Sequence, residues 1–251
     1  MVKKIAFAVI PLSLIIHFVL LFQAKNADFE EQYQVGIYKA DQFLMEQQTA
    51  IEQIGKTYNL ADEDLYLMFS VVYPELVRFL QAEKKADQLA TKLYEVSSDN
   101  VLEKWLQPDF SIGCFQMKVS FVEKLDASFP QESHLPSELD KKVSELKKVD
   151  RQLKYLVLFY KTVQDRFPEI KTFTLEKRVG FLAVCYNLGF DRSKEDINNY
   201  LEAEKKTFPY SRWPLKWYNS WTYAALANKA YQHLKSEYIF KPESSIQPVF
   251  E

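Results

Sequence analysis

The chain has 251 residues, a formal net charge of −2 and a sequence pI near 6.0. This balance argues against a nucleic-acid groove, because contacts with phosphates need a basic excess. A hydrophobic content of 47% and an aromatic content of 15% are too high for a disordered chain. Only five glycines occur, which favours long helices over a turn-rich β fold.

The N-terminus has the pattern of an export segment. Lys3 and Lys4 precede residues 5–22, which are mostly apolar and carry no charge. A positive start followed by such a run is typical of a cleaved signal sequence or a membrane anchor, and this run is long enough to span a bilayer. We interpret residues 1–24 as a signal sequence or anchor and favour an anchor. Residues 25–251 would then form a single domain outside the cytoplasm.

Apolar spacing predicts helices through most of this domain. Acids suited to a helix N-terminus open one of them at Asp62. Another, from Val179 onward, is apolar on nearly all sides, as expected for a helix at the centre of a domain. The predicted helices are residues 34–58, 62–80, 87–96, 140–167, 175–188 and 217–238.

A small β-hairpin is predicted near residues 110–119, with Gln116 in a strand. Alternation along that strand would point Gln116 away from Phe115 and Met117. Loops are expected near residues 130–136 and 190–194, and no internal repeat or domain linker is visible. The sequence therefore predicts a mainly α domain with one hairpin.

Glu75 is an acid among apolar residues of the helix predicted for residues 62–80. Its helical neighbours at i−4 and i+4 are Val71 and Phe79. A carboxyl group in apolar surroundings favours its proton-bearing form, which is the form that cleaves a glycosidic bond. Arg78 at i+3 offers the alternative, because a pair with Glu75 would hold the carboxylate charged and make it structural. Pro74 predicts a kink or a helix end just before Glu75.

Two polar clusters follow later in the chain. Asn187 lies in the most apolar helix, where a buried amide must find hydrogen-bond partners. Asn187 is interpreted as part of a site, as a hydrogen-bonded core amide, or as the cap of the helix before Gly189. Gln116 serves either a site or the solvent face of the hairpin.

Together the three segments resemble the lytic transglycosylase family of the lysozyme-like superfamily. The matching residues are Pro74-Glu75, then Ser111-x-Gly113-x-Phe115-Gln116-Met117, then Tyr186-Asn187-x-Gly189. Leu76, Cys114 and Cys185 stand where this family more often has Ser, Leu and Ala.

The resemblance implies a lysozyme-like helical domain whose cleft binds peptidoglycan glycan strands, in the periplasm or at the periplasmic face of a bacterial inner membrane. Glu75 would protonate the bond between N-acetylmuramic acid and N-acetylglucosamine, and then act as base for the muramyl 6-hydroxyl, which closes a 1,6-anhydro ring. Asn187 would bind the N-acetyl group. The other implied substrate-binding residues are Ser111, Gly113, Gln116, Met117 and Tyr186.

Two alternatives stay open from the sequence. A lysozyme-type hydrolase needs a second carboxylate, for which Asp99 and Asp109 are the candidates. A membrane-tethered module that binds glycan without cleaving it would keep the cleft but have no working acid.

The remaining residue types predict little further chemistry. We expect no cofactor and no metal site, since His17, His134 and His233 are isolated in the sequence. Cys114 and Cys185 are interpreted as two separate buried thiols rather than a disulfide. For the aromatic residues crowded between 208 and 223 we favour core packing over sugar binding, and Trp105 is a further platform for a sugar ring.

Overall fold

The computed structural model describes residues 28–81, 111–132, 135–203, 206–208, 221–237 and 240. Helices dominate these residues, so the prediction of a mainly α fold with a small hairpin is confirmed. The helices are α2 (Phe29–Gln32), α3 (Gln34–Glu46), α4 (Gln48–Tyr58), α5 (Asp62–Gln81), α7 (Val119–Ser128), α8 (Leu139–Leu146), α9 (Val149–Arg166), η1 (Pro168–Thr172), α10 (Leu175–Leu188), α11 (Lys194–Glu202) and α12 (Tyr223–Ser236). The strands are β1 (Ser111–Ile112), β2 (Met117–Lys118), β3 (Lys206–Phe208) and β4 (Trp221–Thr222), which pair as two antiparallel sheets.

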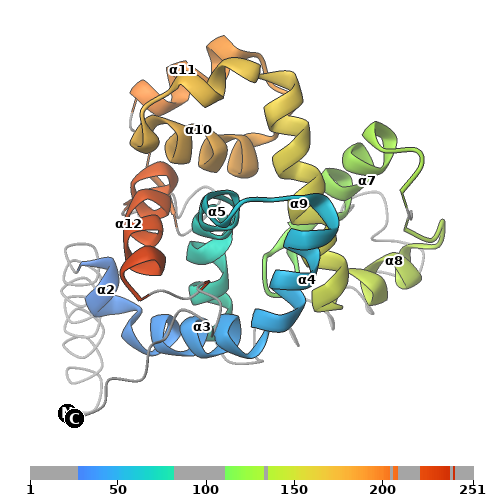
Figure 1. Cartoon of the computed structure of the whole chain (residues 1–251), viewed down its shortest axis with the longest axis horizontal. Coiled ribbons are helices and arrows are strands. Elements are labelled where there is room, and N and C mark those ends of the chain that lie inside the picture. Colours follow the sequence, from blue (N-terminus) through green and yellow to red (C-terminus); the bar gives the residue numbers. More distant parts are fainter. Residues whose placement is uncertain are drawn as a thin grey trace, which may run out of the picture.

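Helix α5 lies at the centre of the molecule, with α12 on one side, α9 on the other, α10 above and α3 below (Figure 1). It starts where the acids predicted it, and the carboxylate of Asp64 accepts a hydrogen bond from the Ala61 amide at 2.9 Å. From Leu65 to Pro74 each of its side chains is buried. The helix runs on through Pro74 to Gln81, so the helix end that was one of the two expectations for Pro74 does not occur.

The segment predicted as one helix over residues 34–58 forms two, α3 and α4, which meet at Gln47. Each covers a different neighbour, since α3 packs on α5 and α4 packs on α9. The apolar spacing of this segment predicts one continuous helix, and its packing against two different neighbours divides it into two.

The segment predicted as one helix over residues 140–167 is also divided, into α8 and α9, and the side chain of Gln152 explains the break. Its amide nitrogen donates to the carbonyl oxygen of Leu146, the last residue of α8. That carbonyl would bond along the helix axis if the helix were continuous. Gln152 is fully buried, so its amide must be paired, and the break provides one of its partners.

Several elements were not predicted. Helix α7 follows β2 directly, and α11 begins at Lys194, where the hydroxyl of Ser193 caps it by accepting from the Asp196 amide at 3.0 Å. The second sheet, β3 with β4, was missed as well. The helix predicted for residues 175–188 has the predicted limits, and its segment from Val179 to Cys185 is buried.

Some predictions lie outside the described residues. These are the N-terminal segment 1–24, the helix predicted for residues 87–96, and the side chains of Asp99, Trp105 and Asp109. In the part of the chain that the structure describes, no helix is both long and apolar enough to cross a membrane.

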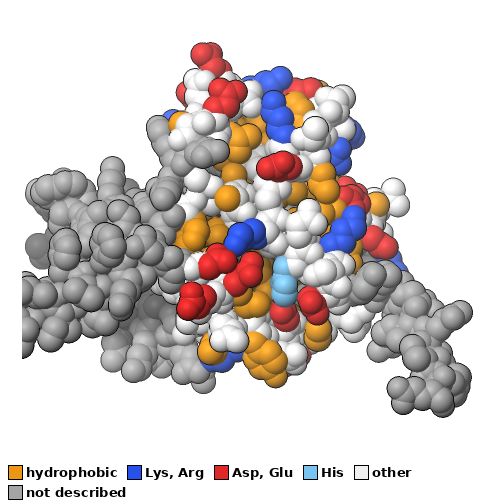
Figure 2. Space-filling view, turned by 90° about the vertical axis from the view of Figure 1, so that its left-hand side faces the viewer, with side chains coloured by type: hydrophobic (Ala, Val, Ile, Leu, Met, Phe, Trp, Pro, Cys, Tyr) orange, Lys and Arg blue, Asp and Glu red, His pale blue; other side chains and the backbone are white. Residues whose placement is uncertain are grey.

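A hollow that does not include the predicted site residues lies between α2, α3 and α12. It has a volume of about 500 Å³, and Phe29, Ile37 and Leu226 are among its apolar lining. Figure 2 shows this face, where acidic side chains and a histidine gather beside apolar ones. At its edge His233 Nε2 lies 3.0 Å from Asp41 of α3, whereas the sequence had left His233 isolated.

Candidate active site

Glu75 lies on α5 at the edge of the buried core. The residues that follow it, Leu76 and Val77, are fully buried, and the side chain of Glu75 itself is 14% exposed. Its helical position is therefore as predicted, with a carboxyl group that is largely removed from water but reaches a cavity.

The surroundings of Glu75 are not purely apolar, because Arg78 pairs with it. The Arg78 Nε donates to Glu75 Oε2 at 2.9 Å, and the terminal nitrogen Nη2 lies 2.7 Å from the same oxygen. Burial opposes the charge of Arg78, but the attraction and hydrogen bond of Glu75 outweigh it and raise the pKa of the guanidinium. The sequence left open whether Arg78 pairs with Glu75, and the structure contains this pair.

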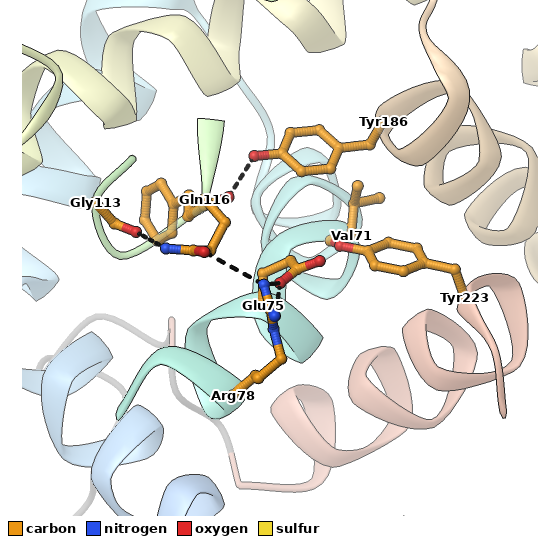
Figure 3. A network of polar contacts seen from close by, with 8 residues as sticks. Val71, Glu75, Arg78, Gly113, Gln116, Tyr186 and Tyr223 are labelled. Atoms are coloured by element: carbon orange, nitrogen blue, oxygen red, sulfur yellow. Dashed lines mark hydrogen bonds and ion pairs between the residues drawn. The ribbon is translucent and has the colours of Figure 1, made fainter. Parts of the chain in front are cut away.

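Gln116 joins this network from the hairpin. Its side-chain oxygen accepts from Arg78 at 3.2 Å, and its amide nitrogen donates to the Gly113 carbonyl at 2.7 Å. Gln116 lies in the turn between β1 and β2 with a positive φ of 55°, so its placement in a strand was wrong. The tight turn points its side chain at α5, and a regular strand would not do so (Figure 3).

The hairpin loop is held in place by the side chain of Gln152 in α9. The Gln152 oxygen accepts from the Phe115 amide at 2.7 Å, and its nitrogen donates to the Ile112 carbonyl at 3.2 Å. Gly113 has a φ of 70°, and a Cβ there would lie 1.5 Å from the Gln152 nitrogen. Only glycine fits this approach. Gly113 is not among the residues that line the cavity.

Tyr186 and Asn187 approach from the C-terminal end of α10, and both line the same cavity as Glu75. The Tyr186 hydroxyl donates to the Phe115 carbonyl at 2.6 Å. Burial raises the pKa of Tyr186 well above its ordinary value, and the charge of Glu75 adds to the rise, so the phenol keeps its proton. The helix ends at Gly189, whose amide donates to the Cys185 carbonyl at 3.0 Å.

Tyr223 is a residue that the sequence did not assign to the site. It opens α12, is buried, and donates from its hydroxyl to the Val71 carbonyl at 2.9 Å, one turn before Glu75. Burial and then the charge of Glu75 raise its pKa well above the ordinary value. In Figure 3 the rings of Tyr186 and Tyr223 both point toward the region of Glu75.

The cavity therefore brings together residues from segments far apart in the chain. It has a volume of about 140 Å³. Of the predicted site residues, the structure places Glu75, Ser111, Gln116, Met117, Tyr186 and Asn187 along its wall. Tyr223, from the aromatic cluster for which core packing was favoured, lines the cavity as well. Lining residues that the sequence did not single out are Lys118, Ser120, Phe121, Lys124, Leu188, Phe190 and Asp191. Asp191 matters most among these, because it gives the cavity a second carboxylate.

The cysteines behave as predicted, because Cys114 and Cys185 are free and buried, and burial raises the pKa of the Cys114 thiol to about 12. Of the described rings in the aromatic cluster, Phe208 is packed in the core, and Tyr223 is buried but also lines the cavity. Trp221 lies half-buried in β4 against Phe29 and Tyr33, not on the last helix where it was expected.

The described residues bring no group of three or more His, Cys, Asp or Glu side chains together as metal ligands. No protein-family model, curated protein or solved structure matches the chain. The chemistry of the cavity is therefore the evidence on which a function has to be argued.

Proposed function

We propose that the chain is a peptidoglycan lytic transglycosylase with a lysozyme-like domain, tethered or exported to the periplasmic side of a bacterial inner membrane. The observation that carries the proposal is the convergence of Glu75, Gln116, Tyr186 and Asn187 on one cavity. These residues come from the three segments on which the family resemblance rests, and α5, the hairpin and α10 bring them together.

In the proposed reaction Glu75, bearing a proton, donates it to the glycosidic oxygen of N-acetylglucosamine as the bond to C1 of N-acetylmuramic acid breaks. The muramyl 6-hydroxyl then attacks C1, and its proton passes to the Glu75 carboxylate. The acid is restored, and no water is consumed. The side-chain amide of Asn187 is suited to holding the N-acetyl group, because an amide both donates and accepts hydrogen bonds.

The phenols fit this chemistry as neutral donors. Tyr186 and Tyr223 hold their protons, since burial raises the pKa of each. Both lie near enough to Glu75 to sense its charge. In the proposed reaction they shape the space beside the acid and keep bulk water from it.

The Arg78 contact sets a condition on this mechanism. Arg78 Nη2 lies 2.7 Å from Glu75 Oε2, whereas the first step needs a proton on the carboxyl group. The proposal therefore requires the contact between Arg78 and Glu75 to loosen when a glycan strand enters. Both described contacts between the guanidinium and Glu75 fall on Oε2, and Figure 3 shows the other carboxylate oxygen turned away from Arg78.

The same contact favours a second candidate function, a non-catalytic module that binds glycan strands. In that case Arg78 and Glu75 would stay paired, and the charged pair would only shape the binding surface. The two candidates differ in whether strands are cut, and they agree on what is bound.

Purified peptidoglycan tests the proposal directly. The full-length protein is expected to release fragments with 1,6-anhydromuramyl ends, and Glu75→Gln is expected to abolish release while strand binding persists. The exposed acid Asp62 on the same helix gives a matched control, because Asp62→Asn makes the same change of charge away from the cavity.

Product mass separates the enzyme classes. Reducing ends would replace the transglycosylase by a hydrolase, with Asp191 as the carboxylate to examine next. Strand binding without release of fragments would favour the non-catalytic module. Full cleavage by Glu75→Gln would refute the assignment of the acid.

A further inference from the structure

The wall of the cavity carries an ion pair that the proposed bond cleavage does not use. Lys124 of α7 donates to Asp191 Oδ2 at 2.7 Å, and both residues line the same cavity as Glu75. Their side chains are 51% and 46% exposed. The pair therefore lies at the open edge of the cavity, where a substituent of a bound glycan would pass.

Asp191 is held firmly on its side of this pair. Gly189 has a φ of 110°, and a Cβ at that position would lie 2.7 Å from Asp191 Oδ1. Arg166 donates to the backbone carbonyls of Asp191 at 2.9 Å and of Arg192 at 3.3 Å. The hydrogen bond from Lys124 lowers the pKa of Asp191, so the carboxylate stays charged. The loop after α10 thus presents a fixed anion, and Lys124 is the longer and more adaptable partner.

Lys124 is a cation at the open edge of the cavity. The described residues that line the cavity include two lysines, Lys118 and Lys124, and two acids, Glu75 and Asp191. Arg78 pairs with Glu75 from outside the lining, so Glu75 already has a cationic partner of its own. An ammonium group at an open edge attracts a negatively charged substituent of a ligand to that edge.

Lys124 can exchange one carboxylate partner for another at little cost in free energy. An exposed ion pair gains little from its attraction, because water screens both charges and both side chains lose freedom. A carboxylate on a ligand can therefore replace Asp191 without exposing a buried charge. A buried pair would resist such an exchange.

From these contacts we propose that Lys124 binds a carboxylate carried by the glycan strand and releases Asp191 in doing so. The peptide attached to muramic acid supplies this carboxylate, because the attachment converts the lactyl carboxyl itself into an amide. Lys124 is then a specificity-determining residue that selects acidic strands over neutral ones. The identity of the strand rests on the proposed function, whereas the preference for a carboxylate rests on the ammonium group of Lys124, which already binds one carboxylate at the edge of the cavity.

Binding to two forms of one substrate tests this proposal. The first is native peptidoglycan, and the second is the same material after its carboxylates have been converted to methylamides. The full-length protein carries Glu75→Gln in all samples so that the strands stay intact. Lys124→Met is expected to weaken binding to native strands roughly two- to fivefold and to leave binding to amidated strands unchanged.

Lys194 provides a matched control. It pairs with Glu169 at 2.7 Å and is 47% exposed, but it does not line the cavity. Lys194→Met is expected to bind both forms as its parent does. Equal weakening of both forms by Lys124→Met, or no change in either, would overturn the proposal.

Asp191→Asn gives an expectation of opposite sign. It removes the competing anion from Lys124, so binding to native strands is expected to tighten, while binding to amidated strands stays the same. Weaker binding to native strands would show that Asp191 itself contacts the glycan and would contradict the exchange. If the parent protein binds neither form, the proposed function fails as well; if it binds strands without the Lys124 effect, only this inference fails.

Discussion

Two carboxylates on neighbouring helices, Glu75 on α5 and Asp41 on α3, have partners of different origin. Glu75 pairs with Arg78 of its own helix, and from there a bond at 3.2 Å leads to Gln116. Asp41 pairs with residues of two other helices. It accepts from the Tyr73 hydroxyl of α5 at 2.6 Å and lies 3.0 Å from His233 of α12.

The difference distinguishes a carboxylate of the candidate site, Glu75, from one that holds helices together, Asp41. A pair within one helix can open without moving the helices, so it suits a group that must respond to a ligand. A carboxylate shared by three helices fixes their relative positions, and its loss is felt by the whole fold. The expectation is that changes at Glu75 alter activity and changes at Asp41 alter stability.

The largest effect is expected from Glu75→Gln. Peptidoglycan cleavage should fall at least about a hundredfold, because a general acid contributes roughly that much or more. The amide oxygen can still accept from Arg78, so the free energy of unfolding should change by less than about 1 kcal/mol. Cleavage assays and urea unfolding of the same sample measure both. A large loss of stability with cleavage intact would mean that Glu75 supports the fold and not the reaction.

Gly113→Ala tests whether the cavity depends on the contact between the hairpin loop and Gln152. The new Cβ would overlap the Gln152 nitrogen at 1.5 Å, and the φ of 70° disfavours alanine. We expect a loss of about 3 kcal/mol in the free energy of unfolding, together with reduced strand binding. Chemical unfolding and sedimentation with peptidoglycan check the two parts. Unchanged stability would mean that the loop is not held by Gln152.

Asp41→Ala should destabilise the protein by about 2 kcal/mol, because the Tyr73 hydroxyl loses its acceptor in a buried position. Cleavage per folded molecule should not change. Glu123→Ala removes an exposed acid that is paired with Lys142, and its effect should be within about 0.5 kcal/mol. Urea unfolding of the two variants measures both effects. Equal effects would mean that Asp41 stabilises the fold no more than an exposed surface acid does.

The smallest effect is a pH dependence at His233. Its hydrogen bond with Asp41 raises the pKa of His233 above the ordinary value of 6.5. A raised pKa stabilises the fold fully below that ordinary value, and the stabilisation is lost as the pH rises through the raised one. Relative to His233→Gln, the protein should lose less than about 1 kcal/mol between pH 6 and 8. Urea unfolding across this range measures the difference, and a parallel response of the two proteins would contradict it.

The sequence predicted elements whose signals are local. The acids at Asp62 and the apolar run from Val179 depend on neighbours along the chain, so the limits of α5 and α10 were predicted to within one residue. The divided helices were not, because the side chain of Gln152 and the packing of α3 and α4 act across the fold. Helix α7 follows β2 without a loop, so its start carries no turn signal.

The candidate site divides in the same way. Motif order identified Glu75, Gln116 and Asn187, which the structure places on one cavity wall. Asp191 was missed, since nothing in its own segment distinguishes it from a solvent-exposed acid. The bond from Tyr223 to Val71 was missed as well, because the two are 152 residues apart. Arg78 was recognised as the competing partner of Glu75, but spacing alone leaves open whether an i, i+3 pair forms.

The buried amide of Gln152 has a consequence for how tightly the cavity can hold a ligand. It binds the amide of Phe115 and the carbonyl of Ile112, so the turn that presents Gln116 is already ordered in the folded protein. The conformational entropy of that turn is lost during folding and not during association. A glycan strand that binds as proposed would therefore meet an ordered wall on the hairpin side, and the rearrangements that it must induce would fall on the side chains of Arg78, Lys124 and Asp191.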